Sequence, residues 1–273
     1  WYDKFMKDNG LDKVVDKLLE DYDFLHNPRY RREKLEELRT AIQNGKFDPA
    51  LRRQVLARWR TQLRYAPVFV RSSSNAEDLP NFSGAGLYSS AFNIRTADQM
   101  LAGIKKVWGS LWNARAYESR TRNYVSQGDV YMSALIQVGV DMEKGGVLIT
   151  KDPYNNVKGD AVYISSVCGH NSRVVNNSGI PEQILFLGET SSISVVTLSD
   201  QENALRFDAR GDLKQVVDKC AGPGGRVISD AEVKRLVDAA KLITVVFDSV
   251  PQDIEWGIMR GRIYVVQTRP YAD

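Results

Sequence analysis

Two runs of alternating apolar and polar residues near the C-terminus, in the stretch DIEWGIMRGRIYVVQTRP, predict a β-hairpin with a basic, glycine-containing turn. Side chains two residues apart on a strand share a face, so Asp253 and Glu255 point the same way, as do Gln267 and Arg269. A three-residue loop at 260–262 places the two polar pairs opposite each other, whereas a two-residue loop puts them on opposite faces. We therefore expect the three-residue loop.

The other face of this hairpin is apolar and fits a protein core. We expect it to consist of Ile254, Trp256, Ile258, Tyr264 and Val266. The polar face by itself is also typical of an ordinary cross-strand ion pair on a solvated sheet. The hairpin alone therefore leaves both a structural role and a binding role open.

The bulk properties are those of an ordinary globular protein, and 273 residues are enough for two lobes. A net charge of +3 without a long basic tract does not point to a nucleic-acid partner. No signal peptide and no apolar run of the roughly 20 residues needed to span a bilayer occurs, so we expect no membrane partner. The two cysteines, Cys168 and Cys220, predict no disulfide framework and no metal-ligand spacing, so we expect a cytoplasmic, reducing location.

Helical periodicity dominates the first 65 or so residues, and short strand-like runs predominate from about residue 129. We therefore expect an α+β protein with a helical N-terminal part at 1–66, the remainder of a first lobe at 67–128, and a largely antiparallel second lobe at 129–273. The chain opens at Trp1 within an amphipathic helix, so we expect it to be a segment of a longer protein.

Two capping boxes mark the starts of later helices. Thr96 with Gln99 predicts one helix, and Ser229 with Glu232 predicts another.

Phosphate-binding chemistry is concentrated in VFVRSSSNAEDLPNFSGAGLYSS. Arg71 comes at the end of a short apolar strand, where its planar guanidinium suits bidentate contact with phosphate. The loop 83–86 (Ser-Gly-Ala-Gly) offers backbone N–H groups that can approach anionic oxygens closely. Ordinary surface loops also contain such glycines, so these residues alone leave phosphate binding open.

Three segments, read together, resemble one protein family. RSSSNAEDLPNFSGAGLY resembles the RSSA-x-x-EDLP…AG signature of the pyruvate phosphate dikinase and phosphoenolpyruvate synthase family. DIEWGIMRGRIYVVQTRP resembles its DIEWA…G-x-L-Y-I-L-Q-T-R-P hairpin, and GVLITKDP resembles its GVLFTADP. The segments follow the family order between Arg71 and Pro270. Rifampicin phosphotransferases and glucan water dikinases share this unit.

The resemblance implies an ATP-grasp-like domain of two lobes that binds ATP with Mg²⁺. It assigns Arg71 and Arg269 to the ATP phosphates. Ser90 falls where the family often has a phosphate-loop threonine, and Gln137 matches a hinge glutamine beside the adenine.

The resemblance also assigns the rest of the polar hairpin. Glu255 and Gln267 match the groups that hold Mg²⁺ and the polyphosphate, with Asp253 beside them. Hard oxygen donors are what Mg²⁺ requires.

The chain departs from the family pattern in three places. It has no counterpart of the N-terminal glycine-loop lysine, and the acidic residue of the family's GLGE segment is absent from Gly169–Ser172. Neither His26 nor His170 lies in the context of the phosphate-carrying histidine. We expect His170 to be a loop or pocket-lining residue, and Trp108 and Trp112, one helical turn apart, to be core residues.

The leading interpretation is the ATP-binding domain of a phosphoenolpyruvate synthase-like phosphotransferase. In that family ATP is cleaved to AMP, a phosphoryl group passes to a histidine on a separate domain, and an acceptor-binding domain completes the reaction. We expect the isolated chain to be inactive, because the complete reaction needs those further domains. The alternatives are the ATP-binding domain of a glucan water dikinase-type enzyme and a non-catalytic nucleotide-binding module.

Overall fold

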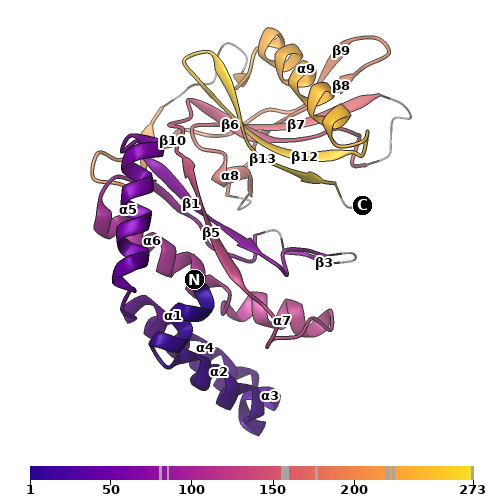
Figure 1. The fold of residues 1–273 in the computed structure, drawn as a ribbon. Coiled ribbons are helices and arrows are strands. Elements are labelled where there is room, and N and C mark those ends of the chain that lie inside the picture. The colour runs from indigo at the N-terminus through magenta and orange to yellow at the C-terminus, as the bar shows by residue number, and fades with distance from the viewer. Residues whose placement is uncertain are drawn as a thin grey trace. The chain divides into compact units, whose positions relative to one another are not determined.

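The computed structural model describes residues 1–79, 82–84, 86–154, 160–175, 178–218, 220, 222 and 225–271, which form two compact units (Figure 1). Unit 1 comprises Trp1–Gly139 and Ala209–Asp212, and unit 2 comprises Val140–Asp208 and Leu213–Asp273. Unit 1 carries most of the helices and unit 2 is built on antiparallel strands, so the predicted α+β class is confirmed.

The helices of unit 1 begin where the sequence offers capping residues. Asn27 and Asp48 each precede a helix whose first residue is proline. The side chain of each accepts hydrogen bonds from two backbone N–H groups in the first turn of that helix. The capping box predicted for Thr96 and Gln99 is present. The helices are α1 (Tyr2–Asp8), α2 (Leu11–Glu20), α3 (Tyr22–His26), α4 (Pro28–Asn44), α5 (Pro49–Leu63), α6 (Ala97–Ser110) and α7 (Ala114–Arg122).

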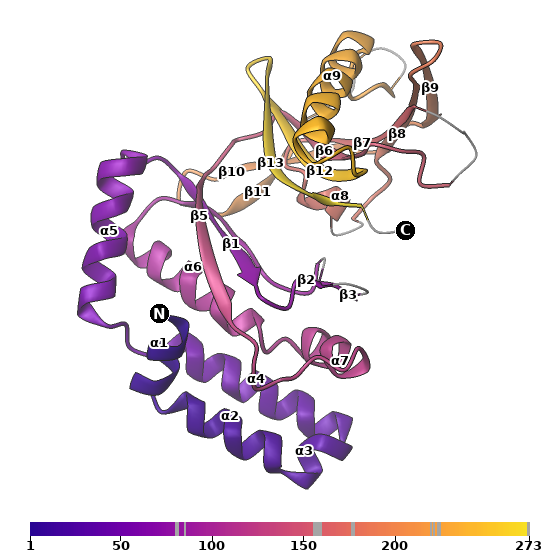
Figure 2. The same cartoon turned by 45° about the vertical axis from the view of Figure 1, so that its right-hand side comes forward.

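The sheet of unit 1 is antiparallel with the strand order β4–β1–β5, and α6 packs against it (Figure 2). A Cβ added to Gly103 of α6 would lie 3.4 Å from Cγ2 of Val70, so the helix lies close to the sheet. Trp108 and Trp112 are buried in this core, as predicted. The strands are β1 (Val68–Ser74), β4 (Ala91–Ile94), β5 (Met132–Val138) and a two-stranded ribbon of β2 (Asp78–Leu79) and β3 (Phe82–Ser83).

Unit 2 begins at Val140 and not at residue 129, because the strand at Met132–Val138 pairs with β1 in unit 1. A strand-like pattern in a sequence does not identify the sheet that the strand joins.

Unit 2 contains a six-stranded antiparallel sheet in the order β13–β12–β6–β7–β8–β9. Helix α9 (Asp230–Val246) begins at the predicted Ser229–Glu232 capping box, and its Leu236 packs in one core cluster with Trp256 of the sheet. The other elements are β6 (Lys144–Ile149), β7 (Ala161–Cys168), α8 (Ser172–Val175), β8 (Glu182–Leu187), β9 (Ser192–Thr197), the paired β10 (Asn203–Phe207) and β11 (Leu213–Val217), β12 (Gln252–Met259) and β13 (Arg262–Pro270).

The C-terminal hairpin, β12–β13, has the predicted pairing of polar residues. Asp253 lies opposite Arg269, and Glu255 lies opposite Gln267. The turn, however, is different from the prediction. Its loop is only Arg260 and Gly261, whose φ angles of 50° and 70° are of the sign that a type I′ turn requires.

A β-bulge reconciles the two-residue loop with the polar pairing. Glu255 pairs with Gln267 while the next residue, Trp256, pairs with Val265, so Val266 is an extra residue on β13. The predicted three-residue loop is therefore wrong, because the extra residue lies inside the strand and not in the turn.

The bulge also changes the apolar face. Ile263, and not the predicted Tyr264, lies opposite Ile258 and packs against the core of unit 2. Tyr264 lies opposite Gly257 and is half-buried.

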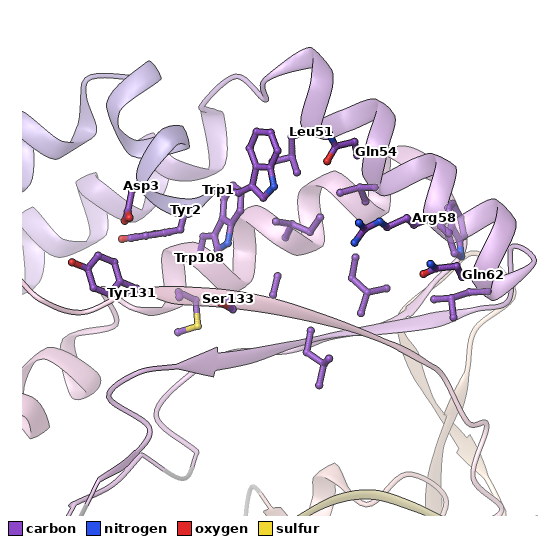
Figure 3. Close-up of a pocket in the computed structure, with 18 residues that line it drawn as sticks. Trp1, Tyr2, Asp3, Leu51, Gln54, Arg58, Gln62, Trp108, Tyr131 and Ser133 are labelled. Atoms are coloured by element: carbon purple, nitrogen blue, oxygen red, sulfur yellow. The ribbon is translucent and has the colours of Figure 1, made fainter.

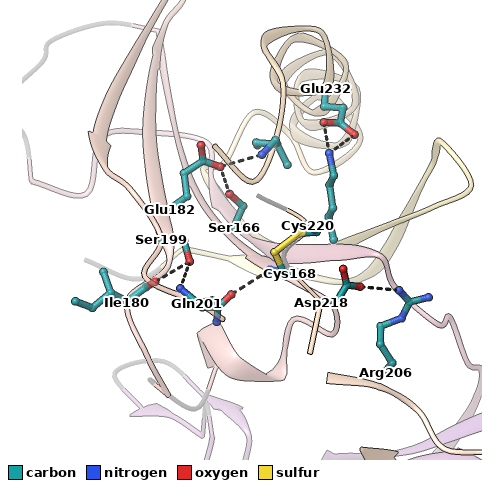
Figure 4. The surroundings of a disulfide bond; sticks show 12 residues. Ser166, Cys168, Ile180, Glu182, Ser199, Gln201, Arg206, Asp218, Cys220 and Glu232 are labelled. Carbon is teal, nitrogen blue, oxygen red and sulfur yellow. Dashed lines mark hydrogen bonds and ion pairs between the residues drawn. A yellow bond between two sulfur atoms is a disulfide. The ribbon is translucent and has the colours of Figure 1, made fainter. Parts of the chain in front are cut away.

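Cys168, at the end of β7, forms a disulfide with Cys220, and their Cα atoms are 5.7 Å apart (Figure 4). The prediction that the two cysteines form no disulfide framework is therefore wrong. The cysteines consequently no longer support the predicted reducing location. A separation of 52 residues in the sequence does not indicate that the fold brings the two cysteines together.

The longest helices of the described part, α4 and α9, have 17 residues each. No helix there is long and apolar enough to cross a membrane.

Candidate functional site: the polar face of the C-terminal hairpin

Four polar side chains share one face of the β12–β13 hairpin: Asp253, Glu255, Gln267 and Arg269, which we call the hairpin polar face. β12 is an interior strand between β13 and β6. Its alternate residues, Ile254, Trp256 and Ile258, are buried in the core that includes α9. Because the apolar set is fixed in the core, the acidic residues between them must face the other side of the sheet.

Arg269 and Asp253 form a charged pair across the hairpin. Nε and Nη2 of Arg269 both donate to Oδ2 of Asp253, at 3.0 and 2.7 Å. Oδ1 of Asp253 is buried and accepts no hydrogen bond from the described residues. An unsatisfied buried carboxylate oxygen is costly, so this atom is a position at which a cation would be stabilised.

Glu255 is contacted from a different part of unit 2. Nδ2 of Asn171 donates to Oε2 of Glu255 at 3.2 Å, and Asn171 is only 2% exposed. Asn171 is not among the site residues predicted from the sequence, in which Gly169–Ser172 was noted only for its lack of an acidic residue. No spacing or motif in the sequence indicates that residue 171 contacts residue 255.

The hairpin polar face fits Mg²⁺ that arrives with a nucleotide. Two carboxylates and an amide oxygen are hard donors, and Mg²⁺ is commonly held by one or two carboxylates together with substrate phosphates. Among the described residues there is no group of three or more His, Cys, Asp and Glu side chains arranged to hold a metal. The two carboxylates and the amide of the hairpin would leave coordination positions of an octahedral Mg²⁺ for phosphate oxygens.

Two further predicted residues lie on one face of the sheet of unit 1. Gln137 of β5 pairs with Phe69 of β1, and Arg71 lies two residues farther along β1 on the same face. β1 continues to Ser74, so Arg71 lies within the strand and not at its end as predicted. Ser90 directly precedes β4 and is half-buried. The predicted site residues thus form two sets, one in each unit.

The glycine loop predicted at 83–86 includes Ala85, which lies outside the described residues. Gly84 donates its N–H to the carbonyl of Glu77, and a Cβ at Gly84 would lie 2.7 Å from that oxygen. Gly86 has a φ of 66°, and Arg115 donates to its carbonyl. A side chain at Gly84 would clash with the backbone of Glu77, and Gly86 has a backbone conformation that residues with a side chain adopt only rarely.

His170 is 3% exposed, and its Nδ1 accepts the backbone N–H of Ser172. This burial within a loop agrees with the predicted loop or pocket-lining role.

A cavity of about 600 Å³ lies elsewhere in unit 1, between α5, α6 and β5 (Figure 3). Trp1, Leu51, Trp59, Trp108 and Tyr131 are among the residues that line it. None of the predicted site residues is among them, so this cavity is not the predicted nucleotide site.

The comparison with known proteins agrees with the resemblance seen in the motifs. The family model described as "Pyruvate phosphate dikinase, AMP/ATP-binding domain" matches residues 1–273. A probable phosphoenolpyruvate synthase from Methanothermobacter thermautotrophicus is 31% identical over 98% of this chain and 39% of its own length. The phosphoenolpyruvate synthase of Pyrococcus furiosus is 32% identical over 74% of this chain and 26% of its own. A rifampicin phosphotransferase from Bacillus subtilis is 30% identical over 80% of this chain and 24% of its own.

The chain therefore spans less than half the length of these relatives. The family match, however, extends over every residue of the chain, and it includes both units. On this evidence the chain belongs to the pyruvate phosphate dikinase AMP/ATP-binding domain family.

Proposed function

We propose that this chain binds Mg·ATP and carries out the ATP-dependent part of a phosphoenolpyruvate synthase-like phosphotransfer. In this proposal it is an ATP-grasp domain whose hairpin polar face holds Mg²⁺ and the polyphosphate. The observation that carries the proposal is the common orientation of Asp253, Glu255, Gln267 and Arg269 on one sheet face. The names of two of the relatives support phosphoenolpyruvate synthase as the type of enzyme.

Each unit contributes one set of residues to the proposal. In unit 2, Glu255, Gln267 and Asp253 hold Mg²⁺, and Arg269 contacts phosphate. In unit 1, Arg71 contacts phosphate, Ser90 belongs to the phosphate loop, and Gln137 contacts the adenine. Arg71 and Arg269 would neutralise part of the charge that develops on the transferring phosphoryl group, and a bound Mg²⁺ would supply further positive charge there. Such charge neutralisation is the main contribution of a protein to this chemistry.

The charged pair of the hairpin suits this task. Asp253 fixes the guanidinium of Arg269 before a ligand arrives, so little side-chain entropy is lost when phosphate binds. Oδ1 of Asp253, which accepts no hydrogen bond from the described residues, gains a partner when the cation binds.

The complete reaction needs more than this chain. We propose that a phosphohistidine domain receives the phosphoryl group and that an acceptor-binding domain, acting on pyruvate, uses it. The small share of the relatives' length that the chain covers supports such further domains. In this proposal the isolated chain binds nucleotide but does not complete phosphoryl transfer to an acceptor.

We place this activity in the cytoplasm, where ATP is available. The disulfide weighs against that location, because disulfides are uncommon in reducing compartments. Trapping of free thiols in intact cells, followed by mass spectrometry of Cys168 and Cys220, would decide between the two arguments.

Isothermal titration calorimetry with ATP, in the presence and absence of Mg²⁺, tests the proposal. We expect binding that depends on Mg²⁺ and that weakens at least tenfold in Glu255→Ala, with circular dichroism confirming the fold. Arg262→Ala is a matched control, because Arg262 lies on the same hairpin but is exposed beside the turn. Equal Mg²⁺-dependent affinity in the wild type and in Glu255→Ala would overturn the assigned site. A folded wild-type chain that binds no ATP would overturn the proposed function.

A further inference from the structure

Asn171 joins a loop of unit 2 to the hairpin polar face. It lies in the segment Gly169–Ser172, which we call the GHNS loop, directly after β7. Its Nδ2 donates to Oε2 of Glu255 at 3.2 Å, although the two residues are 84 positions apart in the sequence. With 2% of its surface exposed, the Asn171 side chain is not an adaptable surface group.

Backbone hydrogen bonds hold the GHNS loop in place. Gly169 donates its N–H to the carbonyl of Glu143, and His170 donates its N–H to the carbonyl of Leu205, both at 2.8 Å. Within the loop, Ser172 donates its N–H to Nδ1 of His170 at 3.2 Å. Because the loop is anchored by its main chain, the position of Asn171 is set by the fold and not by its contact with Glu255.

A glycine in the neighbouring strand permits this close approach. A Cβ added to Gly145 of β6 would lie 2.8 Å from the backbone nitrogen of Asn171 and 2.8 Å from the carbonyl oxygen of Gly169. Gly145 pairs with Gly257 of β12, which is two residues from Glu255 on the same face. The GHNS loop therefore packs directly on the sheet face that carries Glu255.

The chemistry of the contact suits a metal-binding carboxylate. An asparagine amide donates a hydrogen bond but brings no charge, so it orients the Glu255 carboxylate without neutralising it. Arg269, in contrast, both orients Asp253 and neutralises its charge. Hydrogen-bond donors behind a metal ligand fix the ligand's orientation, and their removal typically weakens metal binding about 10- to 100-fold.

We propose that Asn171 is a positioning residue that holds the Glu255 carboxylate ready for the Mg²⁺ of Mg·ATP. This inference rests on the proposed function, because it assumes that Glu255 is a ligand of that metal. The GHNS loop thus serves the metal site through a neutral donor.

The test uses Mn²⁺ as a spectroscopic substitute for Mg²⁺ in the full 273-residue chain. The electron paramagnetic resonance signal of free Mn²⁺ is measured in titrations with a fixed amount of ATP, with and without the chain. The difference between the two titrations gives the affinity of the chain for the metal, because ATP alone also binds Mn²⁺. The variants are Asn171→Leu, which keeps the branched shape of the side chain without the donor, Asn171→Ala, Glu255→Gln and the double variant Asn171→Leu/Glu255→Gln. Ser172→Ala is the matched control, since Ser172 is buried in the same loop and contributes a backbone hydrogen bond that alanine retains.

We expect Asn171→Leu to weaken Mn²⁺ binding about tenfold or more in the wild-type background. The same substitution should change the affinity less than twofold when Glu255 is already glutamine, because the group that Asn171 orients is no longer a carboxylate. Binding of ATP without metal and the far-ultraviolet circular dichroism spectrum should stay unchanged. Asn171→Ala provides the same comparison if the leucine variant does not fold.

Three outcomes separate the inference from the function on which it rests. If Glu255→Gln weakens Mn²⁺ binding and both Asn171 variants do not, the positioning role is wrong and the proposed site stands. If Asn171→Leu has equal effects with and without Glu255, its effect is general to the loop and the inference is also wrong. If Glu255→Gln binds Mn²⁺ as the wild type does, the metal site itself is wrong.

Discussion

Arg269 donates two hydrogen bonds to a single oxygen of Asp253, across the hairpin formed by β12 and β13. The side chains are 26% and 17% exposed, respectively. A charged pair that is this well shielded from water contributes more to stability than a pair at the surface. Removal of one partner leaves the charge of the other partly buried and unpaired. The pair therefore stabilises the hairpin as well as the proposed phosphate site.

Arg269→Ala should lower the free energy of unfolding by about 1.5–3 kcal/mol, because the Asp253 carboxylate loses two charge-assisted hydrogen bonds. Urea denaturation followed by circular dichroism measures this change. The same substitution in an Asp253→Asn background should cost clearly less, since no charge is then left uncompensated. Equal costs in both backgrounds would show that the pair is not the source of the stability.

Glu232 connects α9 to the sheet through Lys144 of β6, with Nζ–Oε distances of 3.0 and 2.8 Å. Burial tends to raise the pKa of the Glu232 carboxyl, but hydrogen bonds from Lys144 and Ser229 outweigh it and hold the pKa below its ordinary value. A carboxyl whose pKa is lowered by folding stabilises the protein above its unfolded pKa. That contribution disappears as the pH falls through the folded pKa.

Glu232→Gln should therefore lower the free energy of unfolding by about 1–2 kcal/mol at pH 7, where the carboxylate is charged. Glutamine can still complete the capping box with Ser229, so the charge is the main difference. The gap between wild type and variant should close between pH 5 and a pH below the ordinary glutamate pKa of about 4.3. A gap that persists unchanged at low pH would contradict this; Glu189→Gln, at an exposed position of unit 2, is the control.

Reduction of the Cys168–Cys220 disulfide should lower the free energy of unfolding by about 2–4 kcal/mol, because the bond closes a long loop in the unfolded chain. Denaturant titrations with and without dithiothreitol measure the change. The double variant Cys168→Ser/Cys220→Ser should be insensitive to dithiothreitol. Two reactive thiols in the denatured, unreduced wild type would show that the bond is not formed.

Much of the local structure could be predicted from the sequence, because it depends on residues close together in the chain. The capping boxes at Thr96 and Ser229 form as predicted. Alternation in the last strands also gave the correct polar face, since the apolar residues between the polar ones are buried.

The turn of the hairpin shows where such reasoning fails. Alternation required one extra residue between the two arms, but it did not determine whether that residue lies in the loop or in a strand. The structure places it at Val266 as a β-bulge, so that a two-residue loop with positive φ at Arg260 and Gly261 can form. Both arrangements give the same polar pairing, and only the packing of the sheet distinguishes them.

The sequence alone determined the α+β class, the family motifs and the residues that share a face of one strand. These features depend on periodicity and on residues close together in the chain. The tertiary structure decided which distant segments meet. It brings Cys168 to Cys220 and Asn171 to Glu255, and it assigns the strand at Met132–Val138 to unit 1. These contacts depend on how loops and strands far apart in the chain pack together, and no pattern in a single sequence predicts that packing.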